Sequence, residues 1–533
     1  MYRVPAIIAH HLSYSFTTAK SPIDDAFLTF TQTRYGIVGD NGVGKTTLLK
    51  LLAHQLKPEQ GFIEIFGSVD YFPQINTDYL GKEIVADLLG ISDKLNALER
   101  IAQGSVYETD YDLIGNDWDI KEKVHLILTD LDLNSITLTT PLTSLSGGQK
   151  TKCWLAKAML SQADFLLFDE PTNNLDWQTK EYFYNWLEQT NRGILIASHD
   201  RQLLKQVDEI IELTSLGINH FGGNYTFYRE QKLVKQEALN HQLTAAKITL
   251  KNTQNSIQQT LEKHERRQKK GRALRKAKKI DKLAANSKQG RSEKTQSKDK
   301  IKAFNQIQKA KEKIQDIKLN IEIKEKISAN FSTAKIPTSK IILNIEQLSF
   351  SFNKNQPLFN NFNLTLLGQE RLAIQGKNGS GKSTLIQLIL GNLKPHQGSI
   401  YRGFSHACYL DQTLSYLNSS LTLVENLCLK NAFFSIEEAY TRLAAFNFRN
   451  RFAEKKASEL SGGEYMRAGL AISLSAAKQP ELLILDEPTN HLDIQSIESI
   501  EEMLSIYQGT LILVSHDSHF LSNIGITKDV NLS

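Results

Sequence analysis

Lysine, acidic and histidine residues recur in this sequence at a spacing suited to phosphate chemistry. The segment Gly39-Asp-Asn-Gly-Val-Gly-Lys-Thr46 follows an apolar strand-like stretch and precedes a helix-like one. Its glycines allow backbone N–H groups to close around phosphate oxygens, its lysine can reach the β- and γ-phosphates, and its threonine hydroxyl can bind Mg²⁺. The pattern recurs at Gly376-Lys-Asn-Gly-Ser-Gly-Lys-Ser383. The sequence therefore predicts two sites for ATP and Mg²⁺.

Each phosphate loop is accompanied by two further apolar stretches that end in polar residues. The first ends in Asp-Glu, where the aspartate is placed to hold the metal through its water shell and the glutamate is the candidate general base. The second is followed by a histidine, which we expect to contact the γ-phosphate. These residues are Asp169, Glu170 and His199 in the first half, and Asp486, Glu487 and His516 in the second half.

The chain is thus an internal repeat, with a first repeat at 1–228 and a second at 340–533. Leu145-Ser-Gly-Gly-Gln149 also recurs, as Leu460-Ser-Gly-Gly-Glu464. The two loop lysines lie 337 residues apart but the two histidines only 317. The first repeat therefore holds about 20 extra residues, and we expect this insert within 82–118. Strands alternating with helices indicate an α/β fold for both repeats.

The segment between the repeats, 229–339, has a long-helix composition. Apolar residues repeat at spacings of three, four and seven on either side of a polar stretch, which predicts an antiparallel helical hairpin. The seams are Leu239, Leu243, Ala246, Leu250 and Ile257 on one side, and Ile307, Ala310, Ile314, Ile317 and Ile321 on the other. The expected tip, 263–300, holds 16 Lys/Arg and 4 Asp/Glu, a net charge of +12. Because the whole chain has a net charge of +5, the rest of it has a net charge of −7.

Composition narrows the class of protein. Hydrophobic residues make up 41% and charged residues 23%, as in ordinary folded domains. No apolar run approaches the roughly 18 residues that span a bilayer, and the N-terminus lacks a signal-peptide core, so we expect a cytoplasmic protein without a membrane-spanning segment. The three cysteines, Cys153, Cys408 and Cys428, have no paired spacing, so neither a zinc site nor a disulfide framework is predicted.

These motifs resemble those of ATP-binding cassette (ABC) ATPases, and of the ABC-F subfamily in particular. Leu-Ser-Gly-Gly ahead of the Asp-Glu strand is the ABC signature. The stretches Asp169-Glu-Pro-Thr-Asn-Asn-Leu-Asp176 and Asp486-Glu-Pro-Thr-Asn-His-Leu-Asp493 look like ABC-F, as does Phe221-Gly-Gly-Asn-Tyr-Thr-Phe-Tyr228 at the start of the linker. The resemblance implies two P-loop ABC-type ATPase domains joined by an α-helical antiparallel coiled-coil hairpin.

The resemblance also assigns roles within each site. Gln74 and Gln412 match the glutamine that senses Mg²⁺ and the γ-phosphate; with Thr46, Ser383, Asp169 and Asp486 they form the expected metal set. Phe16 and Phe352 match the aromatic that stacks on adenine, with Tyr14 and Phe350 as rivals. The remaining phosphate-loop residues expected to hold ATP are Gly39, Asn41, Gly42, Gly44, Lys45 and Thr47, and Gly376, Asn378, Gly379, Gly381, Lys382 and Thr384.

In this family the two cassettes pair head to tail, here within one monomeric chain. Site one would then combine Lys45 with the signature Ser461, Gly462 and Gly463, and site two Lys382 with Ser146, Gly147 and Gly148. Donors at a helix N-terminus suit a γ-phosphate. ATP would hold the two repeats together, and hydrolysis would release them.

The resemblance implies a ribosome-associated translation factor whose hairpin reaches large-subunit rRNA and P-site tRNA near the peptidyl-transferase region. Phosphate contacts by basic residues give affinity without sequence choice. The candidates are Arg266, Arg267, Lys269, Lys270, Arg272, Arg275, Lys276, Lys278 and Lys279. A housekeeping role and antibiotic resistance by ribosome protection both stay open, and the insert is short for the family's ribosome-contacting arm. Two other classes are the ATPase component of a membrane transporter and a DNA-associated ATPase.

Overall fold

The computed structural model describes residues 4–16, 19–74, 83–173, 175–276, 302, 304–315, 336–352, 357–411, 417–431, 433–476, 478–490 and 492–532. They form two compact units, one containing both repeats (Met1–Tyr225 and Lys326–Ser533) and one containing the connecting segment (Thr226–Glu325). Within these residues, no helix combines the length and the apolar character needed to cross a bilayer.

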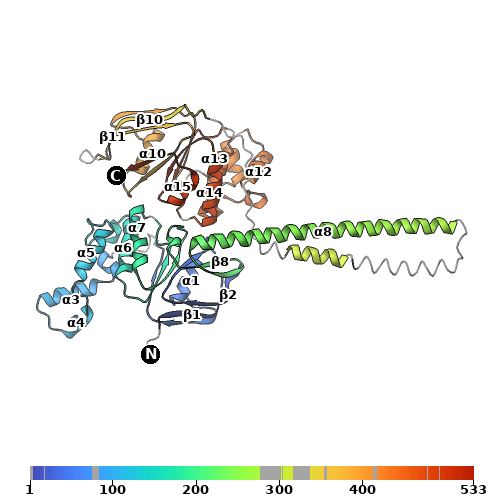
Figure 1. The fold of residues 1–533 in the computed structure, drawn as a ribbon. Helices are drawn as coiled ribbons and strands as arrows, with labels where there is room; N and C mark the ends of the chain where they lie inside the picture. The colour runs from blue at the N-terminus through green and yellow to red at the C-terminus, as the bar shows by residue number, and fades with distance from the viewer. Residues whose placement is uncertain are drawn as a thin grey trace. The chain divides into compact units, whose positions relative to one another are not determined.

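Each repeat is built on a mainly parallel sheet (Figure 1). The strand order is β5-β6-β7-β3-β8-β9 in the first repeat, where β9 alone is antiparallel, and β14-β15-β16-β12-β17 in the second, where all pairs are parallel. The first sheet comprises β3 (Arg34–Val38), β5 (Val69–Phe72), β6 (Phe165–Asp169), β7 (Gly193–Ala197), β8 (Glu209–Thr214) and β9 (Gly217–Gly222). The second comprises β12 (Arg371–Gly376), β14 (Ala407–Leu410), β15 (Leu482–Asp486), β16 (Thr510–Val514) and β17 (Lys528–Leu532). The central strands are continuous apolar runs because helices and a second sheet bury both of their faces.

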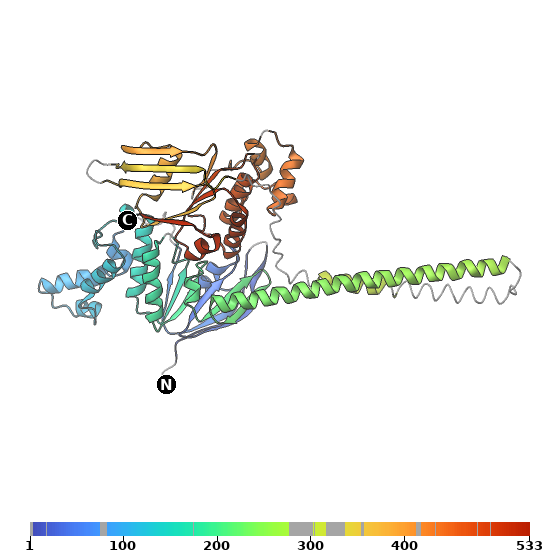
Figure 2. The ribbon, with the colours of Figure 1, turned by 45° about the horizontal axis from the view of Figure 1, so that its top comes forward.

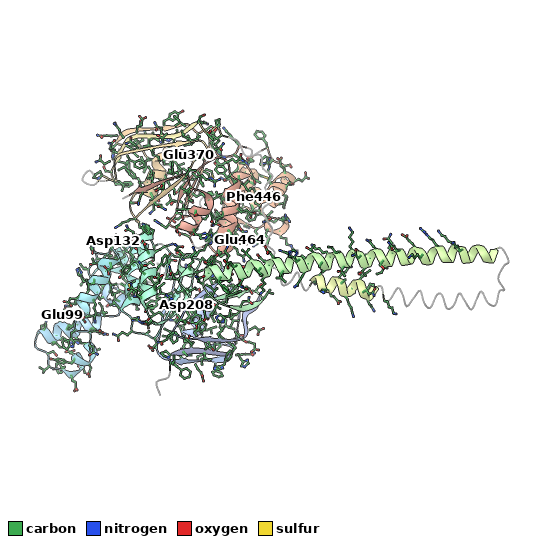
Figure 3. The ribbon with its side chains drawn as sticks, viewed as in Figure 1. Glu99, Asp132, Asp208, Glu370, Phe446 and Glu464 are labelled. Carbon is green, nitrogen blue, oxygen red and sulfur yellow. The ribbon has the colours of Figure 1, made fainter. Side chains whose placement is uncertain are left out.

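An ion pair fixes the amino edge of each large sheet. Arg34 at the start of β3 donates from Nε and Nη2 to the Asp208 carboxylate, at 3.0 and 2.9 Å. In the second repeat Lys528 Nζ, at the start of β17, lies 2.9 Å from Glu370 Oε2, just before β12. Figure 3 labels both acidic residues. The ion pair joins β3 to β8 in the first repeat and β12 to β17 in the second, which are corresponding strands. The basic residue belongs to β3 in the first repeat, whereas in the second it belongs to β17.

A three-stranded antiparallel sheet completes each nucleotide-binding half. The order is β2-β1-β4 in the first repeat and β11-β10-β13 in the second. A helix that follows the phosphate loop packs between the two sheets, so that Leu48 and Leu49 share a core with Ile7 and Phe165. The elements are β1 (Ala6–Phe16), β2 (Ala19–Phe30), β4 (Gln60–Phe66) and α1 (Lys45–Leu52), then β10 (Ile341–Phe350), β11 (Phe359–Leu367), β13 (Gln397–Arg402) and α10 (Lys382–Leu390).

The remaining helices form a helical part in each repeat. In the first they are α2 (Val85–Leu89), α3 (Ser92–Ala102), α4 (Glu108–Ile114), α5 (Ile120–Asp130), α6 (Gly147–Leu160) and α7 (Trp177–Gln189). In the second they are α11 (Leu423–Lys430), α12 (Ile436–Ala445), α13 (Gly462–Leu474), α14 (Ile494–Ile506) and α15 (Ser518–Ile524). Helices α3 and α4 are the surplus pair, and both lie within the range predicted for the insert. A salt bridge between Arg100 and Asp110 joins them.

The connecting unit is dominated by one helix, α8, which runs unbroken over Tyr225–Lys276. Half-buried positions along it include Leu239, Leu243, Ala246, Leu250 and Ile257, the members of the predicted seam. A second helical stretch at 304–315 is half-buried at Ile307, Ala310 and Ile314, and Figures 1 and 2 both draw it alongside α8. Ile317 and Ile321 lie outside the described residues. The predicted seam side chains that the structure describes are therefore half-buried.

An aromatic cluster supports the strand that carries Asp169. Phe168 stacks on Phe72 and meets Phe183 edge-on, and Phe183 in turn stacks on Trp186 with ring centroids 5.9 Å apart. Phe183 is completely buried. Removing its ring would leave a cavity behind β6.

We therefore expect Phe183→Ala to lower the unfolding free energy of the first repeat by about 3–5 kcal/mol. The four tryptophans (118, 154, 177 and 186) all lie in the first repeat, so tryptophan fluorescence during urea unfolding reports this repeat alone. Tyr107→Ala is the matched control, because that side chain is 73% exposed. Equal midpoints for the two variants would contradict this role of the cluster.

Candidate nucleotide-binding sites

The strand order brings three predicted motifs to one edge of each sheet. In the first repeat β6, β7 and β3 are neighbours, with Asp169 opposite Ala197 and Ala197 opposite Ile37. Ligands of open parallel sheets bind at the carboxyl ends of the strands, where the loops after them converge. The phosphate loop, the Asp-Glu pair and His199 therefore meet at this edge, and β15, β16 and β12 repeat the arrangement.

The phosphate loop is held against the last parallel strand of its sheet. Gly39 has φ = 154°, and a Cβ there would lie 2.4 Å from the carbonyl oxygen of Leu213. Gly376 has φ = 147°, with the Leu532 carbonyl oxygen 2.3 Å from the corresponding point. Both loops thus need glycine for conformation and for space. Gly44 and Gly381, in the left-handed region, then cap the helices α1 and α10.

The loop lysine lies at the centre of each site. Lys45 Nζ donates to the carbonyl oxygen of Gly39 at 2.8 Å and lies 2.8 Å from His199 Nε2. Lys382 Nζ has the same partners, Gly376 at 2.7 Å and His516 Nε2 at 3.2 Å. Burial lowers the pKa of both lysines, while neighbouring carboxylates oppose that shift. A phosphate would supply the negative charge that such a buried ammonium favours.

Oxygen ligands suited to Mg²⁺ lie beside each lysine. Thr46 Oγ1 donates to Asp169 Oδ2 at 2.7 Å, and Ser383 Oγ donates to Asp486 Oδ2 at 3.2 Å. No cluster of three or more His, Cys, Asp or Glu that could hold a metal occurs within the described part of the chain. A hydroxyl and one carboxylate fit Mg²⁺, which takes few protein ligands and keeps waters and nucleotide phosphates for the rest.

The two candidate bases sit on an unusual backbone. Glu170 and Glu487 have φ values of 51° and 48°, the left-handed region that non-glycine residues rarely adopt. Their N–H groups donate across the sheet edge to Ala197 at 2.8 Å and Val514 at 2.9 Å, which fixes the turn. Strain of this kind, about 1–3 kcal/mol per residue, concentrates at functional sites.

Burial shapes the chemistry of these glutamates. Burial raises the pKa of Glu170 and raises that of Glu487 to about 7, with the loop lysine opposing the shift in both cases. Glu170 Oε1 is buried and accepts no hydrogen bond from any described group. A buried carboxylate oxygen that accepts no hydrogen bond and lies next to the phosphate loop can take a proton from a water molecule, as a general base requires.

The two histidines are held neutral. Burial, and then the neighbouring lysine, lower the pKa of His199, and burial lowers that of His516 to about 4. His199 Nε2 lies 3.1 Å from Asn41 Oδ1 and 3.4 Å from Glu170 Oε1. One imidazole therefore touches the phosphate loop, the lysine and the candidate base, which suits a residue that senses the γ-phosphate.

The repeats also contact one another at these sites. The Asn41 N–H donates to Asp493 Oδ2 of the second repeat at 3.2 Å. A cavity of about 320 Å³ is lined by Gly147 and Gly148 of the first repeat, and by Asn378, Glu487 and His516 of the second. A buried ion pair, Arg201 Nη1 to Glu501 Oε1 at 2.7 Å, joins the repeats nearby. Gly147 and Gly148 of the first signature thus share this cavity with Asn378 of the second phosphate loop, whereas Ser146 and Lys382, the other members of the predicted second site, are not in its lining.

The cavity of the first site, unlike that of the second, is lined by residues of one repeat. This cavity, about 380 Å³, is lined by Asn41, Gly42, Gly44, Lys45, Thr46, Thr47, Gln74, Asp169, Glu170, Asn173 and His199. Among the described residues, all of these come from the first repeat, and Ser461, Gly462 and Gly463 are not in the lining. Ser146 and Ser461 have matching local roles, since each caps its signature helix by accepting the N–H three residues on, at 3.3 Å.

The other predicted residues fall partly outside the described structure. Phe352 is 69% exposed whereas its rival Phe350 is buried against His396, so Phe352 is the one of the two whose ring is accessible, and its stacking on adenine stays a prediction. Gln412, the side chain of Phe16 and the residues Lys278 and Lys279 lie outside the described part. On α8, Arg266, Lys269 and Lys270 are exposed; the side chains of Arg267, Arg272, Arg275 and Lys276 are not described.

Two tyrosines belong to the sites although the motifs did not predict them. Tyr71 and Tyr409 place their hydroxyls 3.4 and 3.2 Å from the Asp169 and Asp486 carboxylates. Each lies three residues before its predicted glutamine, so alignment of the repeats would have identified them. Asp176 and Asp493, the last residues of the Asp-Glu stretches, each accept from the N–H three residues on, at 3.0 and 2.8 Å, and so cap α7 and α14. The contact of Asp493 with Asn41 gave no such signal, because Asn41 belongs to the other repeat.

Comparison with known proteins agrees with this geometry. The family model described as "ABC transporter" matches residues 26–173 and 359–490. Putative ATP-binding protein YdiF of Bacillus subtilis is 31% identical over 94% of this chain and 76% of its own length. ABC transporter F family member 5 of Arabidopsis thaliana is 29% identical over 92% of this chain and 70% of its own. The solved structure of RNase-L Inhibitor has a TM-score of 0.59 at 17% identity, covering 97% of this chain and 86% of that one, which shows a shared fold.

Replacing both loop lysines should abolish nucleotide turnover. We expect Lys45→Ala and Lys382→Ala each to slow turnover at its own site by at least roughly 100-fold, because each removes the charge closest to the reacting phosphate. The double variant should release no phosphate above background in a phosphate-release assay. Lys57→Ala, an exposed lysine just beyond α1, is the control. Wild-type turnover in the double variant would exclude these sites as the catalytic ones.

Proposed function

This chain belongs to the ABC-F family of ATP-binding cassette proteins and hydrolyses ATP, and from that premise we propose that it is a translation factor that binds the ribosome in its ATP-bound state. Its target within the ribosome is the P-site tRNA and the peptidyl-transferase region of large-subunit rRNA, reached through the connecting unit. Mg²⁺ accompanies the nucleotide.

The connecting unit is the observation that carries this proposal. An ATPase of two cassettes needs no 52-residue helix between them, so α8 has a task of its own. The 263–300 segment has a net charge of +12 in a chain whose remainder is acidic. Its described members Arg266, Lys269 and Lys270 are exposed to solvent. A concentrated cationic segment on an acidic body favours a polyanion with closely spaced phosphates, and RNA is one.

Solved structures with this fold support the same direction. They include a complex of an archaeal ribosomal stalk protein with the ribosome recycling factor aABCE1, at a TM-score of 0.57 and 17% identity. They also include ribosome-bound archaeal Pelota and ABCE1, at 0.51 and 18%. In those proteins, paired cassettes of this fold work with ribosomes. We extend that use to this chain.

The chain's own residues supply most of the mechanism. Lys45 and Lys382 bind the terminal phosphates, while the signature backbone of the first repeat closes on the second site. Thr46 and Asp169 at the first site, and Ser383 and Asp486 at the second, would hold Mg²⁺, which would supply positive charge against the phosphates. Glu170 and Glu487 take the proton from the attacking water, and the neutral histidines hold the γ-phosphate in place. Loss of the γ-phosphate removes a bridge between the repeats, which then separate and withdraw the connecting unit from RNA.

Blocking hydrolysis should lock the chain on ribosomes. We expect Glu170→Gln/Glu487→Gln to bind ATP and to co-sediment with ribosomes through a sucrose cushion, because the bridging phosphates persist. With ADP, the same variant should stay in the supernatant. If the ATP-bound variant stays wholly ribosome-free, the proposal is wrong. ATPase stimulation by a membrane fraction would favour a transporter component, and stimulation by DNA a DNA-associated ATPase.

Neutralising three basic residues that α8 contributes to the 263–300 segment should weaken that binding and its salt dependence. We expect Arg266→Gln/Lys269→Gln/Lys270→Gln to reduce the slope of log affinity against log salt by about 2–3, since each RNA phosphate contact contributes roughly 0.7–0.9. Lys235→Gln/Lys247→Gln/Lys251→Gln is the matched control, with the same charge change at exposed positions nearer the start of α8. Equal slopes for the two triple variants would show that the basic residues of the 263–300 segment do not contact RNA phosphates, which contradicts this part of the proposal. Growth with and without the gene across ribosome-targeting antibiotics separates housekeeping from resistance.

A further inference from the structure

A lysine outside the predicted motifs makes the two nucleotide sites unequal. Lys180 lies on α7, four residues after Asp176. The second repeat follows the first at an offset of 317 over this region, so its counterpart is Ile497. Ile497 is 2% exposed and belongs to the hydrophobic core of the second repeat. At this position the first repeat therefore has a cationic side chain, whereas the second has a buried aliphatic one.

Lys180 faces the second site although it belongs to the first repeat. It lines the same cavity of about 320 Å³ as the signature glycines Gly147 and Gly148, the candidate base Glu487 and the histidine His516. These other groups are the ones expected around the γ-phosphate of the second nucleotide. The cavity at the first site has no such lysine in its lining, where Lys45 is the single cationic side chain among the described residues.

The ammonium of Lys180 is paired with one carboxylate and has the capacity to donate to further acceptors. Its Nζ lies 3.1 Å from Asp200 Oδ2, an oxygen that also accepts from the Tyr184 hydroxyl at 2.8 Å. Its side chain is 17% exposed. Asp200, Asp517 and Glu487 together raise its pKa against the effect of burial, so it stays charged. An ammonium has three N–H donors, so it can hold Asp200 and a phosphate oxygen at once.

We propose that Lys180 is a phosphate-binding residue which the first repeat contributes to the second nucleotide site, where it holds the terminal phosphate of ATP more tightly than the first site can. The inference rests on ATP hydrolysis by the chain and not on ribosome binding, so the two can fail separately. Closure of the repeats brings the cation to the phosphate, and the second site therefore depends on closure for part of its affinity.

Single-site enzymes test this directly. In a Glu170→Gln background the second site is the one with an intact base, and in a Glu487→Gln background the first is. We expect Lys180→Ile to raise the KM for ATP of the second site about tenfold, with a much smaller change in kcat, and to raise that of the first site far less. Lys180→Arg should restore the KM of the second site to within about threefold, because a cation returns.

Asp200→Asn separates this role from a structural one. It removes the ion pair but leaves the lysine charge in the cavity, so the KM of the second site should stay near that of its background. If Asp200→Asn reproduces the effect of Lys180→Ile, the lysine merely holds Asp200 and the proposal is overturned. An equal effect on both sites, no effect on KM, or failure of Lys180→Arg to restore it would overturn it as well.

Discussion

Everything in the two sites depends on which strands are neighbours in the large parallel sheets. The phosphate loop, the Asp-Glu pair and the histidine come from segments up to 160 residues apart, yet β3, β6 and β7 end side by side. Hydrogen bonding between these strands fixes the spacing of their ends. The distances from Lys45 to His199 and from Thr46 to Asp169 follow from that register. With a different strand order the lysine, the carboxylates and the histidine would lie apart, even if every motif were unchanged.

The sequence predicted the parts of the sites that depend on local chain. Phosphate loops, strand-end carboxylates and capped signature helices are set by glycine conformation, apolar runs and N-cap residues, all of which a sequence displays. The apolar seam of α8 could be predicted equally well, because apolar residues repeating every seven positions are typical of helices that pack along one another. Leu239, Leu243 and Ala246 lie half-buried as that period requires.

Features that depend on packing between the repeats could not be predicted. Asp493 contacts the first phosphate loop, and Lys180 enters the second cavity, only because two folded surfaces meet. Nothing in the local pattern around Lys180 distinguishes it from a solvated lysine on a helix. Likewise the left-handed backbone of Glu170 results from the cross-sheet bond to Ala197, not from any preference of glutamate. Near-identical motifs thus concealed two chemically distinct sites.

The unbroken length of α8 has a mechanical consequence. Its first residue, Tyr225, is 3% exposed, so the helix starts inside the folded body of the first repeat. At 1.5 Å per residue, 52 residues span about 78 Å. Within α8 the sequence holds a glycine near the far end and no proline to absorb bending. A rotation of about 5° at the start would therefore carry the far end through about 7 Å. An angular change too small to rearrange a packed core would thus become, at that radius, a displacement larger than one turn of the helix itself.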